Sequence, residues 1–305
     1  MSRRRAWTIA AVVAAVVAAA VTAAAVWSLT RSPDPAQAAA GFVAALESGD
    51  GAAAVGALAD AAAHPGLADA FAAAEAHVTD AHVTAVDVED DRARAAATAT
   101  LDGRAVDVGF SLERRDGRWL VADDALRTVT VTTSIGTSIG IGGTVLPAGA
   151  LSLLPAQYRV TAAPGTLLSG AVVIDVPADD GAAASASVPA ALTAEARTRA
   201  QEQIDAYADA CTQTAGRVPE ACALHIPWQA DLREARSFAY RVERRPVVTV
   251  SDDGRTFEAV NGSVVVTVSG VARDGRETSA TYRNDAWALR GDVTVDDTGM
   301  TLSVR

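Results

Sequence analysis

The two cysteines, Cys211 and Cys222, are the residues best suited to covalent chemistry, and the 305-residue chain has no others. An even cysteine count in an exported chain, which the N-terminal segment predicts below, favours a structural disulfide. Closing a loop of this size is expected to stabilise the fold by about 2–3 kcal/mol. A redox pair is the alternative, but thiol exchange favours Cys-x-x-Cys at a helix N-terminus. Cys211 instead lies near the end of a predicted helix, which favours the structural disulfide.

The four histidines, the next candidates for chemistry, are His64, His77, His82 and His225. Only His77 and His82 lie close together in the sequence. On a strand, residues separated by an odd number point to opposite faces of the sheet, so these two rings diverge. The sequence therefore predicts no shared metal site, and exposed histidines in loops and at strand edges are expected.

Acidic pairs recur along the chain, nearly always in predicted turns, where an Asp side chain hydrogen-bonds its own backbone. No Asp-x-Asp-x-Asp-Gly calcium loop and no Gly-x-Ser-x-Gly motif is present. All 26 basic residues are Arg, so Ser-x-x-Lys, Schiff-base and Walker chemistry are excluded together. We therefore expect no enzyme, no catalytic residue, no cofactor and no metal. The acidic pairs are Asp90-Asp91, Asp123-Asp124, Asp179-Asp180, Asp252-Asp253 and Asp296-Asp297.

A short segment that follows the second cysteine is the candidate contact tip of the protein. It consists of His225, Pro227 and Trp228. An aromatic side chain fixed by a disulfide and a proline is suited to contact a partner. The alternative is that Trp228 packs in the core, as aromatic residues usually do.

The first part of the chain changes from a helical to a strand pattern. Asp34 and Pro35 favour a helix over about 36–48, with Phe42 and Leu46 on one face. Two more short helices are expected before residue 77. Alternating hydrophobic residues then predict strands over 78–89, 93–101, 105–113 and 119–126, with turns at Asp102-Gly103 and Asp116-Gly117. Helices followed by an antiparallel meander predict an α+β domain.

This region resembles the nuclear-transport-factor-two-like (cystatin-like) superfamily. The resemblance lies in a Phe42-containing helix that ends in Gly49-Asp50, and in a closing strand around Gly117, Trp119 and Val121. It implies a curved sheet clasped by helices. It implies no particular activity, because the superfamily includes enzymes, ligand binders and inert scaffolds.

The rest of the chain is predicted to be mostly β. Residues 127–176 alternate loosely, with a hairpin turn at Gly142-Gly143, and 179–190 are predicted to form a flexible linker or loop. A helix is expected over about 193–212. A second meander with strands 264–268, 278–282, 287–295 and 302–304 follows, punctuated by Asn261-Gly262 and Asn284-Asp285. Whether this helix and meander repeat the first domain stays open.

The N-terminal segment predicts a membrane anchor. Three arginines precede 25 uncharged residues, 6–30, and Arg31 follows. At about 1.5 Å per residue this run is long enough to span a bilayer, and the charge bias places the N-terminus in the cytoplasm. The alternative is a signal peptide cleaved after Ala36-Gln37-Ala38, but its apolar run is longer than is usual for such a peptide. Either alternative exports the bulk of the chain.

Composition narrows the range of partners. Four of the 26 arginines lie at or before residue 31, which leaves 22 against 37 acidic residues, a formal charge of −15. Such a surface repels nucleic acid. The richness in Ala, Val, Gly, Asp and Arg is typical of a GC-rich genome such as that of an actinobacterium.

The fold class expected from the sequence is α+β, with one N-terminal transmembrane helix. The expected function is that of a non-catalytic, membrane-anchored extracytoplasmic module of the bacterial cell envelope that binds another envelope protein. The alternative is an apolar ligand or lipid binder that uses a cavity of the first domain, lined by Val106, Val108, Phe110 and Leu112. The expected parts are 1–31 cytoplasmic tip and anchor, 34–126 cystatin-like domain, 127–176 small β domain, 177–191 linker, and 192–305 C-terminal α+β domain with the disulfide.

Overall fold

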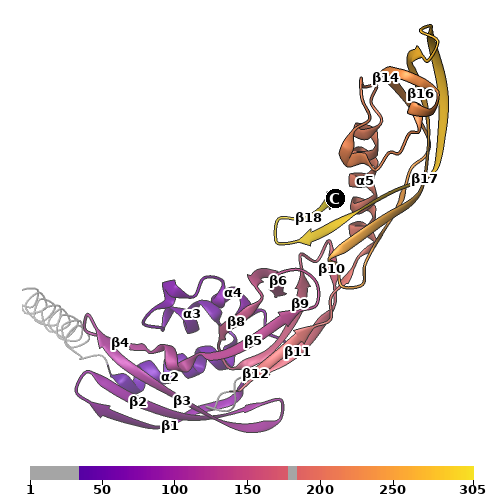
Figure 1. Ribbon diagram of the computed structural model, residues 1–305. Helices are drawn as coiled ribbons and strands as arrows, with labels where there is room; N and C mark the ends of the chain where they lie inside the picture. The colour runs from indigo at the N-terminus through magenta and orange to yellow at the C-terminus, as the bar shows by residue number, and fades with distance from the viewer. Residues whose placement is uncertain (1–33, 178–183) are drawn as a thin grey trace, which may run out of the picture. The chain divides into compact units, whose positions relative to one another are not determined.

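The computed structural model describes residues 34–177 and 184–305 (Figure 1). These residues divide into two compact units. The first contains the described residues up to Ala68 together with His77–Leu126, and the second contains Asp69–Ala76 together with Arg127–Arg305. The predicted anchor, residues 6–30, lies outside the described ranges. Within those ranges, no helix is both long and apolar enough to cross a membrane.

Helix α2 (Pro35–Ser48) opens the first unit. The Asp34 side chain accepts a hydrogen bond from the Ala36 N–H at 2.9 Å, and Gly49 ends the helix with φ +69°. The predicted face is confirmed, since Phe42 and Leu46 are fully buried. Shorter helices follow: α3 (Gly51–Gly56), the 3-10 turn η1 (Ala61–Ala63), and α4 (Leu67–Ala72), whose residues are divided between the two units.

An antiparallel sheet in the order β1-β2-β3-β4 packs against α2. The predicted turns are confirmed, because Asp102 and Asp116 adopt φ of about +50° and each is followed by a glycine with positive φ. Val108, Phe110 and Leu112 are buried, and the rings of Phe42 and Phe110 lie 5.0 Å apart. The strands are β1 (Thr79–Glu89), β2 (Arg92–Leu101), β3 (Arg104–Arg115) and β4 (Arg118–Val121), followed by the 3-10 turn η2 (Asp123–Ala125).

Short strands form the first part of the second unit. One sheet has the order β11-β9-β6-β7, another β12-β5-β8, and β10 pairs with β13. Gly142 and Gly143, with positive φ, form the predicted hairpin turn between β6 and β7. The strands are β5 (Arg127–Thr133), β6 (Ser138–Ile141), β7 (Thr144–Pro147), β8 (Gly149–Leu153), β9 (Ala156–Ala163), β10 (Leu168–Ser169), β11 (Ala171–Val176), β12 (Ala184–Val188) and β13 (Ala191–Leu192).

The last sheet of the second unit is built on two long strands, β16 (Thr256–Ala272) and β17 (Glu277–Val295), which pair along most of their length. β14 (Leu232–Arg244) and β15 (Val247–Val250) both pair with the edge of β16 that faces away from β17. β14 pairs with the C-terminal part of β16 and β15 with its N-terminal part. β18 (Met300–Val304) pairs with β17 and forms the opposite edge. Helix α5 (Ala194–Cys211) contacts both β15 and β18, and the 3-10 turns η3 (Glu220–Cys222) and η4 (Trp228–Ala230) precede β14.

The expected α+β fold class is wrong. Of the described residues, 53% are in strands and 21% in helices. The Ala-rich stretch after α2 breaks into pieces of six residues or fewer, since Gly56 and the His64-Pro65-Gly66 segment interrupt it. Part of the expected linker, residues 184–188, is strand β12, which pairs in parallel with β5. A strand ladder joins main-chain groups, so the short run Ala184–Val188 forms one although its Ala and Ser side chains offer little apolar surface.

Two of the expected turns are also wrong. Asn261-Gly262 lies inside β16, which begins at Thr256, well before the predicted strand 264–268. Asn284-Asp285 lies inside β17, so the predicted strands 278–282 and 287–295 are one continuous strand. Asn261 has φ +64° and the pairing register shifts around Gly262, which marks a β-bulge. A Cβ on Gly262 would lie 2.8 Å from the Trp287 carbonyl oxygen, so the strands approach closely there.

Candidate functional site

The candidate site is the segment 222–228, which contains the predicted contact tip, and helix α5 leads to it. Thr193 begins α5 by accepting a hydrogen bond from the Ala196 N–H at 3.1 Å. Ala196, Ala200, Ile204 and Ala208 recur every four residues and are buried, so one face of the helix is fixed against the unit. Cys211 lies at the end of this face and is itself buried.

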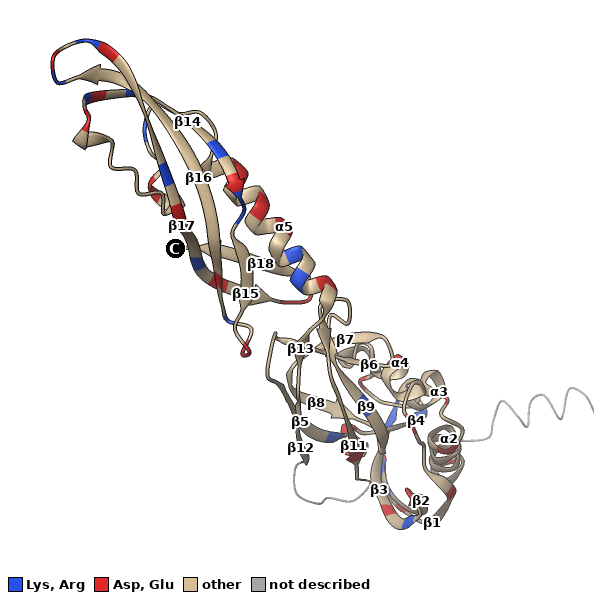
Figure 2. Ribbon diagram, turned by 90° about the vertical axis from the view of Figure 1, so that its right-hand side faces the viewer, with Lys and Arg blue, Asp and Glu red and all other residues tan. Residues whose placement is uncertain are grey.

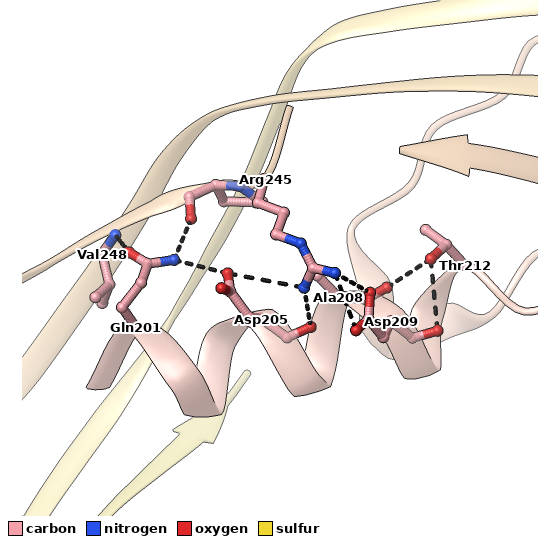
Figure 3. Close-up of polar contacts among 8 residues, drawn as sticks. Gln201, Asp205, Ala208, Asp209, Thr212, Arg245 and Val248 are labelled. Atoms are coloured by element: carbon pink, nitrogen blue, oxygen red, sulfur yellow. Dashed lines mark hydrogen bonds and ion pairs between the residues drawn. The ribbon is translucent and has the colours of Figure 1, made fainter. Parts of the chain in front are cut away.

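Polar side chains fix α5 to the neighbouring strand β15, as Figure 3 shows. The Gln201 side chain accepts a hydrogen bond from the Val248 N–H at 3.0 Å and donates one to the Pro246 carbonyl at 2.9 Å. The Arg245 guanidinium donates to the Asp205 carbonyl at 3.0 Å and pairs with the Asp209 carboxylate at 2.8 Å. The C-terminal half of α5 is therefore held in a defined position.

The second cysteine, Cys222, is attached to the end of this fixed helix. Cys211 and Cys222 lie at disulfide distance, with Cα atoms 5.6 Å apart. The indole N–H of Trp287, a fully buried residue of β17, donates to the Cys222 carbonyl at 2.8 Å. The start of the segment is thus held to α5 by its side chain and to β17 by its main chain.

From Cys222 onward, buried and exposed side chains alternate without a regular strand. Leu224 and Ile226 are buried, whereas His225 and Pro227 are exposed. Within the described ranges, the main chain of residues 224–226 forms no hydrogen bond to another residue. Its N–H and C=O groups are therefore left for water or for another chain. We call residues 222–228 the pinned segment.

Trp228 ends the pinned segment and is half-buried. Its ring lies edge-on to buried Phe238, with centroids 6.2 Å apart. Just beyond it, the Tyr282 hydroxyl donates to the Asp231 carboxylate at 2.8 Å. Desolvation, followed by this carboxylate, raises the pKa of Tyr282 to about 12, so its phenol stays protonated and keeps donating at neutral pH.

The structure places the expected site residues as follows. It brings Cys211 and Cys222 together, and it places the exposed His225 and Pro227 next to the half-buried Trp228. Trp287, which bonds the start of the segment, and Tyr282, which bonds Asp231 just beyond its end, were not expected at the site. Both lie about sixty residues after the segment in the sequence. Nothing in the sequence except their residue type indicated that they would contact it.

The other histidines and acidic pairs lie elsewhere. His64 is 3.2 Å from the Asp123 carboxylate, and His82 contacts the Thr98 hydroxyl at 3.1 Å. Asp253 and Asp296 accept hydrogen bonds from the backbone of their own turns, as expected for turn residues. Among the described residues, no group of three His, Cys, Asp or Glu side chains is placed to hold a metal ion.

Comparisons of the chain with protein-family models, with curated proteins and with solved structures gave no match. The resemblance to the nuclear-transport-factor-two-like superfamily stays a prediction. A function for the chain is therefore argued from its own residues.

Proposed function

We propose that this protein is a non-catalytic, membrane-anchored extracytoplasmic module that binds another protein of the bacterial cell envelope. The anchor rests on residues 6–30, with their charge bias and length. The binding role rests on one observation, the pinned segment. Its outward side chains and its unpaired main chain are held in place before any partner arrives.

Fixing a segment in advance lowers the entropy lost on binding. The covalent link at Cys222, the indole hydrogen bond from Trp287 and the buried Leu224 and Ile226 all restrict the segment. An extended partner strand is able to hydrogen-bond the main chain of residues 224–226 while its side chains contact His225 and Pro227. No catalytic group is needed for this role.

The alternative of an apolar ligand in the first domain is not supported. Phe110 and Leu112 are both 1% exposed, and Phe110 packs against Phe42 of α2. The apolar face that was expected to line a cavity is therefore covered by the protein's own helix.

Site-specific photo-crosslinking tests the proposal on the full chain in native membranes. A photoreactive amino acid replaces His225, and a matched control carries it at exposed Glu202 on α5. We expect one near-stoichiometric envelope protein to be crosslinked from position 225 and not from 202, and Pro227→Asp to reduce the yield several-fold. Equal crosslinking from both positions, or none from 225, would contradict the proposal.

A further inference from the structure

A second surface, in the first unit, carries charged side chains that face one another without pairing. A groove of about 840 Å³ is lined by the ends of β1 and β3, the start of β2, and η2. This volume lies within the range of natural ligand sites. The residues that line it are Asp87, Val88, Glu89, Arg92, Ala93, Arg94, Ser111, Leu112, Glu113, Ala122 and Asp124.

The strand register arranges four of the six charged side chains that line the groove in two rows; Glu113 of β3, which lies opposite Arg92, pairs with Arg115 instead. Asp87 lies opposite Arg94, and Glu89 lies opposite Arg92. Because side chains alternate along a strand, all four stand on the face opposite buried Ala93. The acidic row and the basic row are about 5 Å apart, and the two residues within each row are about 7 Å apart.

These four side chains have no hydrogen bond or ion pair to other residues of the described ranges. The neighbouring strand behaves differently, since Arg114 pairs with Asp91, and Arg115 pairs with Asp60 at 3.0 Å. Two guanidinium groups and two carboxylates in the groove are thus free to bind a ligand.

We propose that this groove binds an extended peptide segment with alternating acidic and basic residues. Successive side chains of an extended peptide point to opposite sides, and every second residue recurs after about 7 Å. A peptide that lies along the groove therefore directs one set of side chains to the Arg row and the other to the acidic row. Its carboxylates pair with Arg92 and Arg94, preferentially as bidentate contacts, and its cations pair with Asp87 and Glu89.

The peptide is favoured over a purely acidic ligand by the charge of the groove. An acidic ligand would meet the two arginines but would be repelled by Asp87 and Glu89. A second copy of the same face offers complementary rows, but two hollows that face each other leave the space between them unfilled. This site is separate from the pinned segment and goes beyond the function proposed above.

Titration calorimetry on the full purified chain tests the proposal with two blocked peptides of equal composition. The probe is acetyl-Glu-Lys-Glu-Lys-amide, and the control is acetyl-Glu-Glu-Lys-Lys-amide, in which the alternation is lost. We expect the alternating peptide to bind at least fivefold more tightly. We also expect binding to weaken several-fold between 50 and 500 mM NaCl, because salt screens exposed charges.

Variants test whether the peptide binds in the groove. Arg92→Gln combined with Arg94→Gln should weaken binding of the alternating peptide at least tenfold. Arg104→Gln, at the other end of the same sheet and outside the groove, should leave it unchanged. The proposal is overturned if no binding is measured at millimolar peptide, if both peptides bind equally, or if the double variant binds like the unaltered chain.

Discussion

At the scale of single residues, nearly every ion pair among the described residues joins an arginine to a carboxylate at the surface; Figure 2 colours these two kinds of residue blue and red. Asp60 is an example, because the hydrogen bond from Arg115 holds the pKa of Asp60 below its ordinary value of 3.8. Such pairs contribute little individually, since water and salt screen them. They matter for the dependence of stability on pH.

The Asp60–Arg115 pair predicts a loss of stability in acid. A carboxyl with a lowered pKa in the folded state stabilises the fold fully above its unfolded pKa. This contribution is lost as the pH falls below 3.8 through the folded value. Asp60→Asn should therefore lower the melting temperature slightly at pH 7, and this difference should shrink as the pH is lowered below 3.8. The control is Asp107→Asn at an exposed position, which should leave the melting temperature unchanged at both neutral and acidic pH. Asp34→Asn is not a suitable control, because Asp34 caps α2.

Loss of the disulfide is expected to lower the stability of the fold more than Asp60→Asn does. Cys211→Ser combined with Cys222→Ser should lower the free energy of unfolding by about 2–3 kcal/mol, as measured in urea. The same variant should show weaker crosslinking from position 225, because its pinned segment has lost one attachment. Unchanged stability would show that the link does not restrict the unfolded chain.

At the scale of elements, local patterns predicted some parts well. The alternation at Val108, Phe110 and Leu112 and the turn at Asp102-Gly103 both describe local geometry, and the structure confirms them. Asn261-Gly262 was predicted as a turn because the same residue types serve turns and bulges. Only the pairing of β16 with β17 distinguishes the two, and pairing is set by distant residues.

The candidate site shows the same limit. The sequence singled out Cys222, His225 and Trp228 from their types and from the nearby proline. The positions of Cys222 and Trp228 depend on Trp287 and Phe238, which reach the segment only after the sheet forms. The charge rows of the groove are visible in the sequence as Asp87-Val-Glu89 and Arg92-Ala-Arg94, but only the strand register shows that they face each other.

Helix α5 is predicted to be stabilised by two glutamines. Gln201 bonds the main chain of β15, and Gln203 accepts from the Leu302 N–H of β18 at 3.0 Å. Gln201→Ala or Gln203→Ala should each lower stability by about 1 kcal/mol, which is about 2–4 °C in melting temperature. Exposed Glu202→Ala, between them, should have no measurable effect. Thermal unfolding followed by circular dichroism compares the three variants.

At the scale of the whole molecule, the charge and the N-terminal segment predict where the chain resides. Alkaline phosphatase fused after Arg305 should be active in bacterial cells, since this enzyme folds only where disulfides form. A green fluorescent protein at the same position, exported unfolded, should be dark. The opposite pattern would place the bulk of the chain in the cytoplasm and would remove the basis for an envelope partner.

The bond between Gln203 and Leu302 joins residues that are 99 positions apart. During synthesis or translocation, α5 emerges well before β18, so this side chain has no strand to bond until residues 300–304 have followed. The sheet around α5 can therefore close only late, after nearly the whole second unit has emerged. Until then the edge strands of the sheet are unpaired. A chaperone that binds the emerging chain would prevent aggregation most effectively during that interval.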